Sequence, residues 1–178
     1  MQPDPEQLFF RDYLPDDRAW VTAANLHHYT DVEGFDAGFA QAVSDALDLL
    51  EAKRTEPTSR FLIVGAGQDP QPVGCVFFSS EPPASGRLRL FYLDQRYRGL
   101  GLGRRMIETM IAHARAQGIG TIRVSTFDRH RAACGLYRAM GFDERARTPV
   151  TAFGQNMHQI DFEKTLPASA RSRRGDIR

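Results

Sequence analysis

The chain has 178 residues, 42% of them hydrophobic, and it carries 23 lysines and arginines against 22 aspartates and glutamates. This size suits a single globular domain, and the unpatterned glycines and prolines exclude fibrous and low-complexity classes. The near-neutral charge creates no global field that would attract nucleic acid, and no apolar run reaches the roughly 20 residues that a membrane helix needs.

The first half of the chain predicts one strand, two helices and three further strands. A short strand is expected over residues 8–14, followed by a turn. Helices are expected over 18–29 and 36–53, because apolar residues of the second stretch recur at three- and four-residue spacing. The period then changes to β-rich runs, which predict a hairpin and, after a Pro/Ser/Gly loop over 81–86, a third strand: 60–64, 73–78 and 88–93.

The second half alternates helices and strands. One apolar stripe predicts a helix over 104–117, ended by Gly118 and Gly120. A strand is expected over 121–127, a short helix over 131–140 and a half-buried strand over 157–164. The order is strand, two helices, three strands, helix, strand, helix and two strands, which predicts a mixed-sheet α/β domain.

The two ends of the chain differ in charge. Residues 168–178 hold four arginines and one acid, a net charge of +3; because the whole chain carries +1, residues 1–167 carry −2. We expect residues 1–167 to form one domain and residues 168–178 to be a flexible basic tail. Binding of nucleic acid through this tail is an alternative that predicts salt-sensitive affinity for DNA, lost when the tail is deleted.

Cysteine usage and the first residues indicate the compartment. Residues 1–6 have neither the basic nor the apolar part of a secretory signal. Cys75 and Cys134 lie in apolar or helical stretches and form no disulfide framework. We therefore expect a cytoplasmic protein without membrane partners. A homodimer is compatible with the sequence, which does not determine the oligomeric state.

The most informative segment runs from a strand through alternating glycines straight into an amphipathic helix. Gly99, Gly101 and Gly103 let the backbone approach a ligand closely and permit positive φ angles. The first amides of the following helix have no intrahelical partner, so they are free to bind phosphate oxygens. Five arginines and a single acid lie between residues 96 and 115. We therefore expect an anionic ligand that carries a pyrophosphate.

Two familiar nucleotide motifs fail on spacing. A P-loop needs Gly-Lys-Ser/Thr after its glycines, whereas Arg104 and Arg105 follow Gly103. A dinucleotide fingerprint needs a third glycine three residues after its second, and Arg104 or Met106 stands there instead.

The pattern that fits is Arg98-x-x-Gly101-x-Gly103, which resembles the acetyl-CoA-binding motif of the GNAT N-acetyltransferase superfamily. Residues 133–142, ACGLYRAMGF, resemble the A-x-x-L-Y-x-x-x-G-F segment of the same family. Together with the helix and strand between them, these motifs cover residues 88–142. The rest of the chain resembles, more loosely, the acetyltransferase half of bacterial MarR-type regulator fusions.

This resemblance implies the GNAT fold, a mixed and mostly antiparallel sheet that splays between strands four and five, with helices on both faces. The pantetheine arm of the co-substrate acetyl-CoA would pair with the backbone of Tyr92 and Leu93. His130 stands where the family usually has an asparagine that contacts the cofactor. No metal is implied. The pyrophosphate would be held by the segment Arg98, Gly99, Leu100, Gly101, Leu102, Gly103 and Arg104.

Tyr137 matches the general acid of the family, which protonates the departing CoA thiolate. An unperturbed tyrosine has a pKa of about 10 and is protonated at neutral pH, so it can donate. A core aromatic residue at helical spacing is the alternative. His130 and Tyr137 are expected on one side of a helix, about 10 Å apart along its axis. Cys134 is expected to be a small buried thiol rather than a nucleophile.

A general base is also expected, because a lysine-like ammonium has a pKa near 10.4 and must lose a proton before it attacks. Glu81, Asp94 and Glu33 are the candidates, and the sequence does not rank them. Residues 20–36 and the connection 148–156 would select the substrate. The histidines show no metal-ligand spacing and are expected at the surface or in packing: His27, His28, His113 and His158.

The sequence thus predicts an acetyl-CoA-dependent N-acetyltransferase that transfers an acetyl group directly, in a ternary complex, to a primary amine of a small molecule or protein. The alternative is a CoA-binding regulatory or interaction module that has the fold without turnover. His130 in place of asparagine favours the module, and Tyr137 favours the enzyme.

Overall fold

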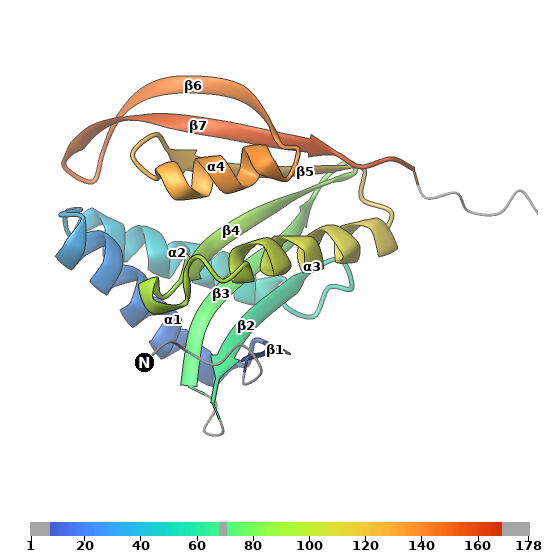
Figure 1. Cartoon of the computed structure of the whole chain (residues 1–178), viewed down its shortest axis with the longest axis horizontal. Helices are drawn as coiled ribbons and strands as arrows, with labels where there is room; N and C mark the ends of the chain where they lie inside the picture. The colour runs from blue at the N-terminus through green and yellow to red at the C-terminus, as the bar shows by residue number, and fades with distance from the viewer. Residues whose placement is uncertain (1–7, 68–70, 169–178) are drawn as a thin grey trace, which may run out of the picture.

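The computed structural model describes residues 8–67 and 71–168, and it has a seven-stranded sheet with helices on both faces (Figure 1). The strand order is β1-β2-β3-β4-β5-β7-β6, and β4-β5 is the parallel pair. The elements, in chain order, are β1 (Leu8–Asp12), η2 (Pro15–Asp17), α1 (Arg18–Leu26), η3 (His27–Val32), α2 (Gly38–Ala52), β2 (Arg60–Ala66), β3 (Gln71–Glu81), β4 (Ser85–Leu93), η4 (Gln95–Tyr97), α3 (Leu102–Ala116), β5 (Thr121–Phe127), α4 (Arg131–Ala139), β6 (Asp143–Ala152) and β7 (Gln155–Thr165). This order confirms the predicted mixed-sheet α/β architecture.

Two apolar cores form because the central strands are buried on both faces. Along β2, Leu62 and Val64 belong to the core that α3 and α4 cover, whereas Phe61 and Ile63 belong to the core under α1 and α2. Successive strand residues point to opposite sides of a sheet, so a continuous apolar run fills both cores. Figure 1 shows α3 on one face of these strands and α1 with α2 on the other.

β4 and β5 are paired over three residues and then diverge. Their ladder runs from Ser85↔Thr121 to Arg87↔Arg123, although both strands continue. The register between β3 and β4 shifts just beyond, where Leu90 has a positive φ of 49°. Such a bulge bends a strand and increases its twist, which carries the end of β4 away from β5. The predicted splay between strands four and five is therefore confirmed, and Figure 1 shows the two strands separating.

Three segments differ from the sequence prediction. The loop expected over 81–86 is shorter, because β3 continues to Glu81 and β4 begins at Ser85. The first helix passes at His27 into the π-helix η3. The segment 148–156, expected as a connection, belongs to the β6-β7 hairpin. Most residues of β6 are exposed, so this edge strand, the other of the two final strands in the predicted order, lacks the apolar alternation that would have given its bounds.

The ends of the chain bear on two predictions. Residues 169–178, which hold the arginines of the expected basic tail, lie outside the described residues. The domain boundary at residue 167 therefore stays a prediction. No helix in the described part of the chain is long and apolar enough to span a bilayer.

Candidate active site

A cavity of about 760 Å³ opens where β4 and β5 diverge. Its walls come from η3, β4, the turn before α3, the end of β5 and the start of α4. This volume is within the usual range for small-molecule sites. Its lining includes the glycine turn, a buried tyrosine and a cluster of aromatic and titratable side chains.

The glycine turn forms part of this cavity. Gly99 and Gly101 have φ angles of 77° and 76°, which glycine adopts without the strain that a side chain would cause. Gly101 is the N-cap of α3, and the amide of Arg105 donates to the Gly101 carbonyl at 3.1 Å. The amides of the three residues in between have no partner inside the helix and lie at the positive end of its dipole. The turn can therefore hold an anion.

Two further contacts fix this turn against its neighbours. The Arg98 Nε atom donates to the Leu93 carbonyl at 2.9 Å, which ties the turn to the end of β4. A Cβ atom at Gly103 would lie 3.2 Å from Leu136 Cδ2 and 3.4 Å from Phe91 Cζ. Glycine at 103 thus lets the start of α3 pack closely against α4 and β4.

Most residues predicted to bind the cofactor meet at this cavity. Leu100 and Leu102 do not line it: Leu100 is 36% exposed, and Leu102 is buried in the core. The cofactor-binding role of all ten predicted residues, these two leucines included, stays a prediction. Those that line the cavity are Tyr92, Leu93, Arg98, Gly99, Gly101, Gly103, Arg104 and His130.

Tyr137 of α4 is both a core residue and a cavity residue. Its side chain is only 2% exposed, and its ring packs against Phe142 and Phe162. Burial raises the pKa of the Tyr137 phenol above its ordinary value, and Tyr29 and Cys134 act in the same direction. The phenol is therefore protonated at neutral pH and able to donate. Cys134 is buried as well, and burial raises the pKa of its thiol, which makes it a poor nucleophile.

Glu33, at the end of η3, is the candidate base that lines the cavity. Its Oε2 atom lies 2.8 Å from His130 Nε2 and 3.6 Å from Arg129 Nε, and its Oε1 atom lies 3.1 Å from His28 Nε2. His130 is the N-cap of α4, and its Nδ1 atom lies 3.2 Å from Thr126 Oγ1. The sequence did not reveal this cluster, and His28, expected at the surface or in packing, is one of its members.

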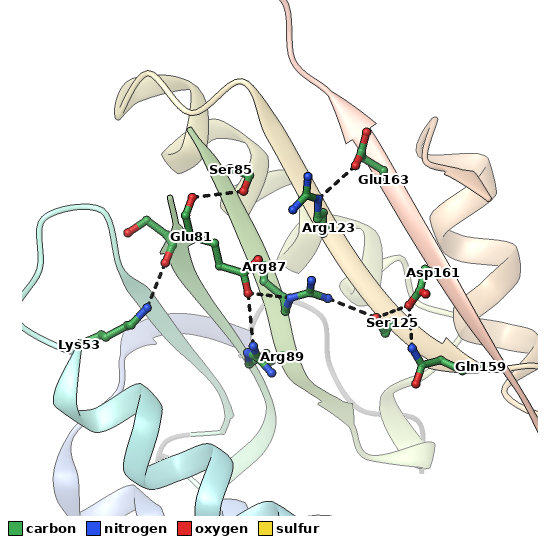
Figure 2. Close-up of polar contacts among 11 residues, drawn as sticks. Lys53, Glu81, Ser85, Arg87, Arg89, Arg123, Ser125, Gln159, Asp161 and Glu163 are labelled. Atoms are coloured by element: carbon green, nitrogen blue, oxygen red, sulfur yellow. Dashed lines mark hydrogen bonds and ion pairs between the residues drawn. The ribbon is translucent and has the colours of Figure 1, made fainter. Parts of the chain in front are cut away.

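The other two candidate bases lie outside the cavity lining. Glu81 accepts hydrogen bonds from Arg87 and Arg89 at the paired ends of β3 and β4 (Figure 2). Burial alone would raise the pKa of Glu81, but the hydrogen bond from Arg87 and the nearby arginines hold it below the ordinary value. Hydrogen bonds from Arg96 lower the pKa of Asp94. Neither carboxylate is arranged as a base for a substrate in this cavity.

The two segments expected to select the substrate come together beside Glu33. Gln155 Nε2, on the β6-β7 hairpin, donates to the Glu33 carbonyl at 2.8 Å. The Asp36 amide donates to the Phe153 carbonyl at 3.0 Å, and the Phe153 ring stacks on Phe35 with centroids 5.2 Å apart. The β6-β7 hairpin and the end of η3, which are far apart in the sequence, thus contact each other at one side of the cavity.

A model of the acetyltransferase (GNAT) family matches residues 12–142 of this chain. The chain is also similar to N-acetyltransferase 8B from Homo sapiens, with 29% identity over 91 residues. That match covers 49% of this chain and 40% of the human protein.

Solved structures resemble the chain over most of its length. Salmonella typhimurium yncA, solved with its cofactor acetyl-CoA, has a TM-score of 0.74 at 19% identity and covers 92% of this chain and 96% of that one. Ribosomal-protein-alanine N-acetyltransferase from Brucella melitensis has a TM-score of 0.71 at 19% identity, covering 89% and 99%. Vibrio cholerae spermidine N-acetyltransferase, in complex with CoA and spermine, has a TM-score of 0.66 at 16% identity, covering 90% and 96%. At these low identities, the structural similarity establishes the fold alone and leaves the substrate open.

Proposed function

This chain belongs to the GNAT family of acetyltransferases, and we propose that it transfers the acetyl group of acetyl-CoA directly to a primary amine in a ternary complex. The amine belongs to a small molecule or a protein. One observation carries the proposal: a helix N-terminus suited to pyrophosphate and a buried tyrosine suited to protonate a thiolate line the same cavity.

The residues of the cavity fit acetyl-CoA. Apart from each glycine and its two chain neighbours, no described atom lies within 4 Å of a Cβ built on Gly99 or Gly101, which leaves room for phosphates against the backbone. Arg98 and Arg104 line the same region and supply positive charge. The last residues of β4 have no partner on β5, so their backbone can pair with an extended arm as an added strand.

Tyr137 acts in this proposal as the general acid. Its phenol gives a proton to the thiolate of CoA as the carbon–sulfur bond breaks, which avoids releasing a free thiolate in an apolar cavity. Burial raises the pKa of Tyr137, so the proton stays in place until the leaving group develops charge. A positioned general acid contributes typically about 10²- to 10⁴-fold to the rate.

Two finer proposals rest mainly on the sequence. The buried and free Cys75 and Cys134 support a reducing cytoplasm. The looser resemblance to MarR-type fusion halves supports a bacterial-type enzyme, with a homodimer as one assembly to be tested. A CoA-binding module without turnover is the second candidate, favoured by His130 in place of the family's asparagine.

The test measures CoA release from acetyl-CoA across a panel of primary amines, together with calorimetric binding of acetyl-CoA. Turnover that falls about 100-fold in Tyr137→Phe, at nearly unchanged acetyl-CoA affinity, would support the proposal. Tyr13→Phe is the matched control, since Tyr13 is also buried but lies outside the cavity lining. Binding without turnover would favour the module, and no binding by the folded protein would overturn both candidates.

A further inference from the structure

The cluster of His28, Glu33 and His130 lies in the cavity but has no part in the proton transfer assigned to Tyr137. Both oxygens of the Glu33 carboxylate are engaged, one by each imidazole, and Arg129 approaches the second oxygen. Each of the three clustered side chains is largely buried, with 15% exposure for Glu33 and 13% for His130. A carboxylate so placed fixes the orientation of two imidazole rings.

The π-helix η3 creates this arrangement. The Glu33 amide donates to the His28 carbonyl at 3.1 Å, a hydrogen bond spanning five residues. In an α-helix, residues five apart differ by about 140° around the axis, because each residue turns about 100°. The wider turn instead brings Glu33 over His28 and closes the contact between their side chains. Turns of this kind occur frequently at functional sites.

His28 is the member of the cluster with a nitrogen left for a substrate. His130 has a neighbour at each ring nitrogen, Glu33 at Nε2 and Thr126 at Nδ1. His28 Nε2 faces Glu33, and the described part of the chain offers its Nδ1 atom no hydrogen-bond partner. The His28 ring also lies edge-on to Tyr92, with centroids 6.1 Å apart. Tyr92 is at the end of β4, where we expect the thioester arm to pair.

Charge and shape in the cavity limit the acceptor. Glu33 is the single carboxylate among the described residues that line it, and both of its oxygens are already engaged. A polyamine would bring several ammonium groups without counter-charges, which is unfavourable in a buried site. The walls beside Glu33 are aromatic and suit an apolar body: Tyr29, Phe39 and Phe127. The positive side chains are Arg89, Arg98, Arg104, Arg129 and Arg131.

We infer that His28 accepts the proton of the acceptor ammonium, oriented by Glu33, and that the acceptor is a monoamine with an apolar body. This inference rests on the proposed acetyl transfer. Burial lowers the pKa of His28, and Arg98 and His130 act in the same direction against Glu33. The imidazole is therefore neutral at neutral pH and ready to accept.

The acetyl transfer converts one ammonium and one thioester into one amide, one thiol and one released proton. His28 Nδ1 takes one proton from the ammonium, and the freed amine nitrogen bonds to the acetyl carbon. The carbon–sulfur bond breaks, and the departing thiolate takes the Tyr137 proton. The new amide nitrogen loses its second proton to the tyrosinate, and His28 returns its proton to solvent. No oxidant or further reactant is needed.

The experiment uses 2-phenylethylamine and spermidine as acceptors for the whole chain. We expect kcat/KM to be at least tenfold higher for 2-phenylethylamine. His28→Gln should lower kcat/KM for 2-phenylethylamine about 100-fold or more while acetyl-CoA affinity stays within twofold. His27→Gln is the matched control, because His27 pairs with Asp31 on the surface, at 71% exposure, and should stay within twofold.

Glu33→Gln tests whether Glu33 orients the His28 imidazole or only packs against it. Since Glu33 raises the pKa of His28, its neutralisation should move the rising limb of the kcat/KM profile to lower pH and reduce its plateau about tenfold. The charged or titratable groups facing His28 are Glu33, Arg98, His130, Tyr29 and Tyr92. A preference for spermidine would overturn the acceptor class, and an unchanged rate in His28→Gln would overturn the base. In both cases wild-type acetyl transfer would persist, whereas failure of the proposed function would abolish CoA release with every amine.

Discussion

Gly101→Val tests the glycine turn, and Gly118→Val at the other end of α3 is its matched control. Both glycines have similar φ angles, 76° and 72°, and no described atom beyond the adjacent residues lies within 4 Å of a Cβ built on either. Gly101 lines the cavity, whereas Gly118 follows the C-terminal end of α3 and does not. The two substitutions therefore share a backbone strain and differ in their position relative to the cavity.

The two variants should lose similar stability and differ in their affinity for acetyl-CoA. A side chain in the left-handed region costs roughly 1–2 kcal/mol, so each variant should lose about that much stability. In a domain of this size, that loss lowers Tm by about 2–8 °C. Valine at 101 also displaces the amides expected to hold the pyrophosphate. Losing two hydrogen bonds to charged groups, at about 1.5 kcal/mol each, weakens acetyl-CoA binding by about 3 kcal/mol, or about 100-fold in Kd.

The assay is calorimetric titration of wild type and both variants with acetyl-CoA, accompanied by thermal unfolding. Equal losses of Tm with a loss of affinity confined to Gly101→Val would support the pyrophosphate site. Unchanged affinity in Gly101→Val would refute the reasoning, and so would an equal loss in Gly118→Val. The second result would mean that strain in α3, rather than contact with the ligand, controls binding.

Two further substitutions test the fold. In Gly86→Ala, the new Cβ would lie 2.1 Å from Phe78 Cζ in the core, so urea unfolding should report a loss of about 1–3 kcal/mol in the free energy of unfolding. Gly120→Ala is the control, because the nearest contact of its Cβ beyond the adjacent residues would be at 3.9 Å, and its stability should be nearly unchanged. Equal losses in the two variants would contradict the packing argument. Burial alone would raise the pKa of Asp17, but two hydrogen bonds from Arg11, each 2.7 Å, help to hold it below its usual value. A carboxyl whose pKa is lower in the folded state stabilises the fold at pH values above its unfolded-state pKa, and this stabilisation is lost as the pH falls. Asp17→Asn should therefore destabilise the protein by about 2 kcal/mol at pH 7 and flatten the decline of the unfolding free energy below about pH 4. An unchanged acid profile would contradict this assignment.

The elements that the sequence predicted well are those set by local chemistry. The glycine turn combines positive φ angles at Gly99 and Gly101 with an amphipathic helix directly after it, and both properties are written in adjacent residues. The apolar runs of β2 and β3 were recognisable because they are buried on both faces. β6 carried no such signal, because an exposed edge strand has no apolar periodicity to detect.

The parts of the site that the sequence left undetermined depend on contacts between distant segments. Glu33 and His130 are 97 positions apart, and Gln155 reaches the Glu33 carbonyl across 122 positions. Glu81 and Asp94 were equally plausible bases until their arginine partners were known. Three carboxylates with the same local chemistry are thus distinguished only by what the fold places around them.

The two adjacent histidines illustrate how one helical turn decides which side chains meet. Helical periodicity pairs residues four apart, and it correctly places His27 beside Asp31, at 3.1 Å, on the exposed side of η3. The same rule gives His28 no acidic partner, because Glu33 is five positions away. The π-turn changes this geometry, closes the His28–Glu33 contact at 3.1 Å and directs both side chains into the cavity. A chain read at 3.6 residues per turn therefore gives Glu33 no histidine partner on its own helix, and the proposed base becomes visible only when the hydrogen bond spanning five residues is seen.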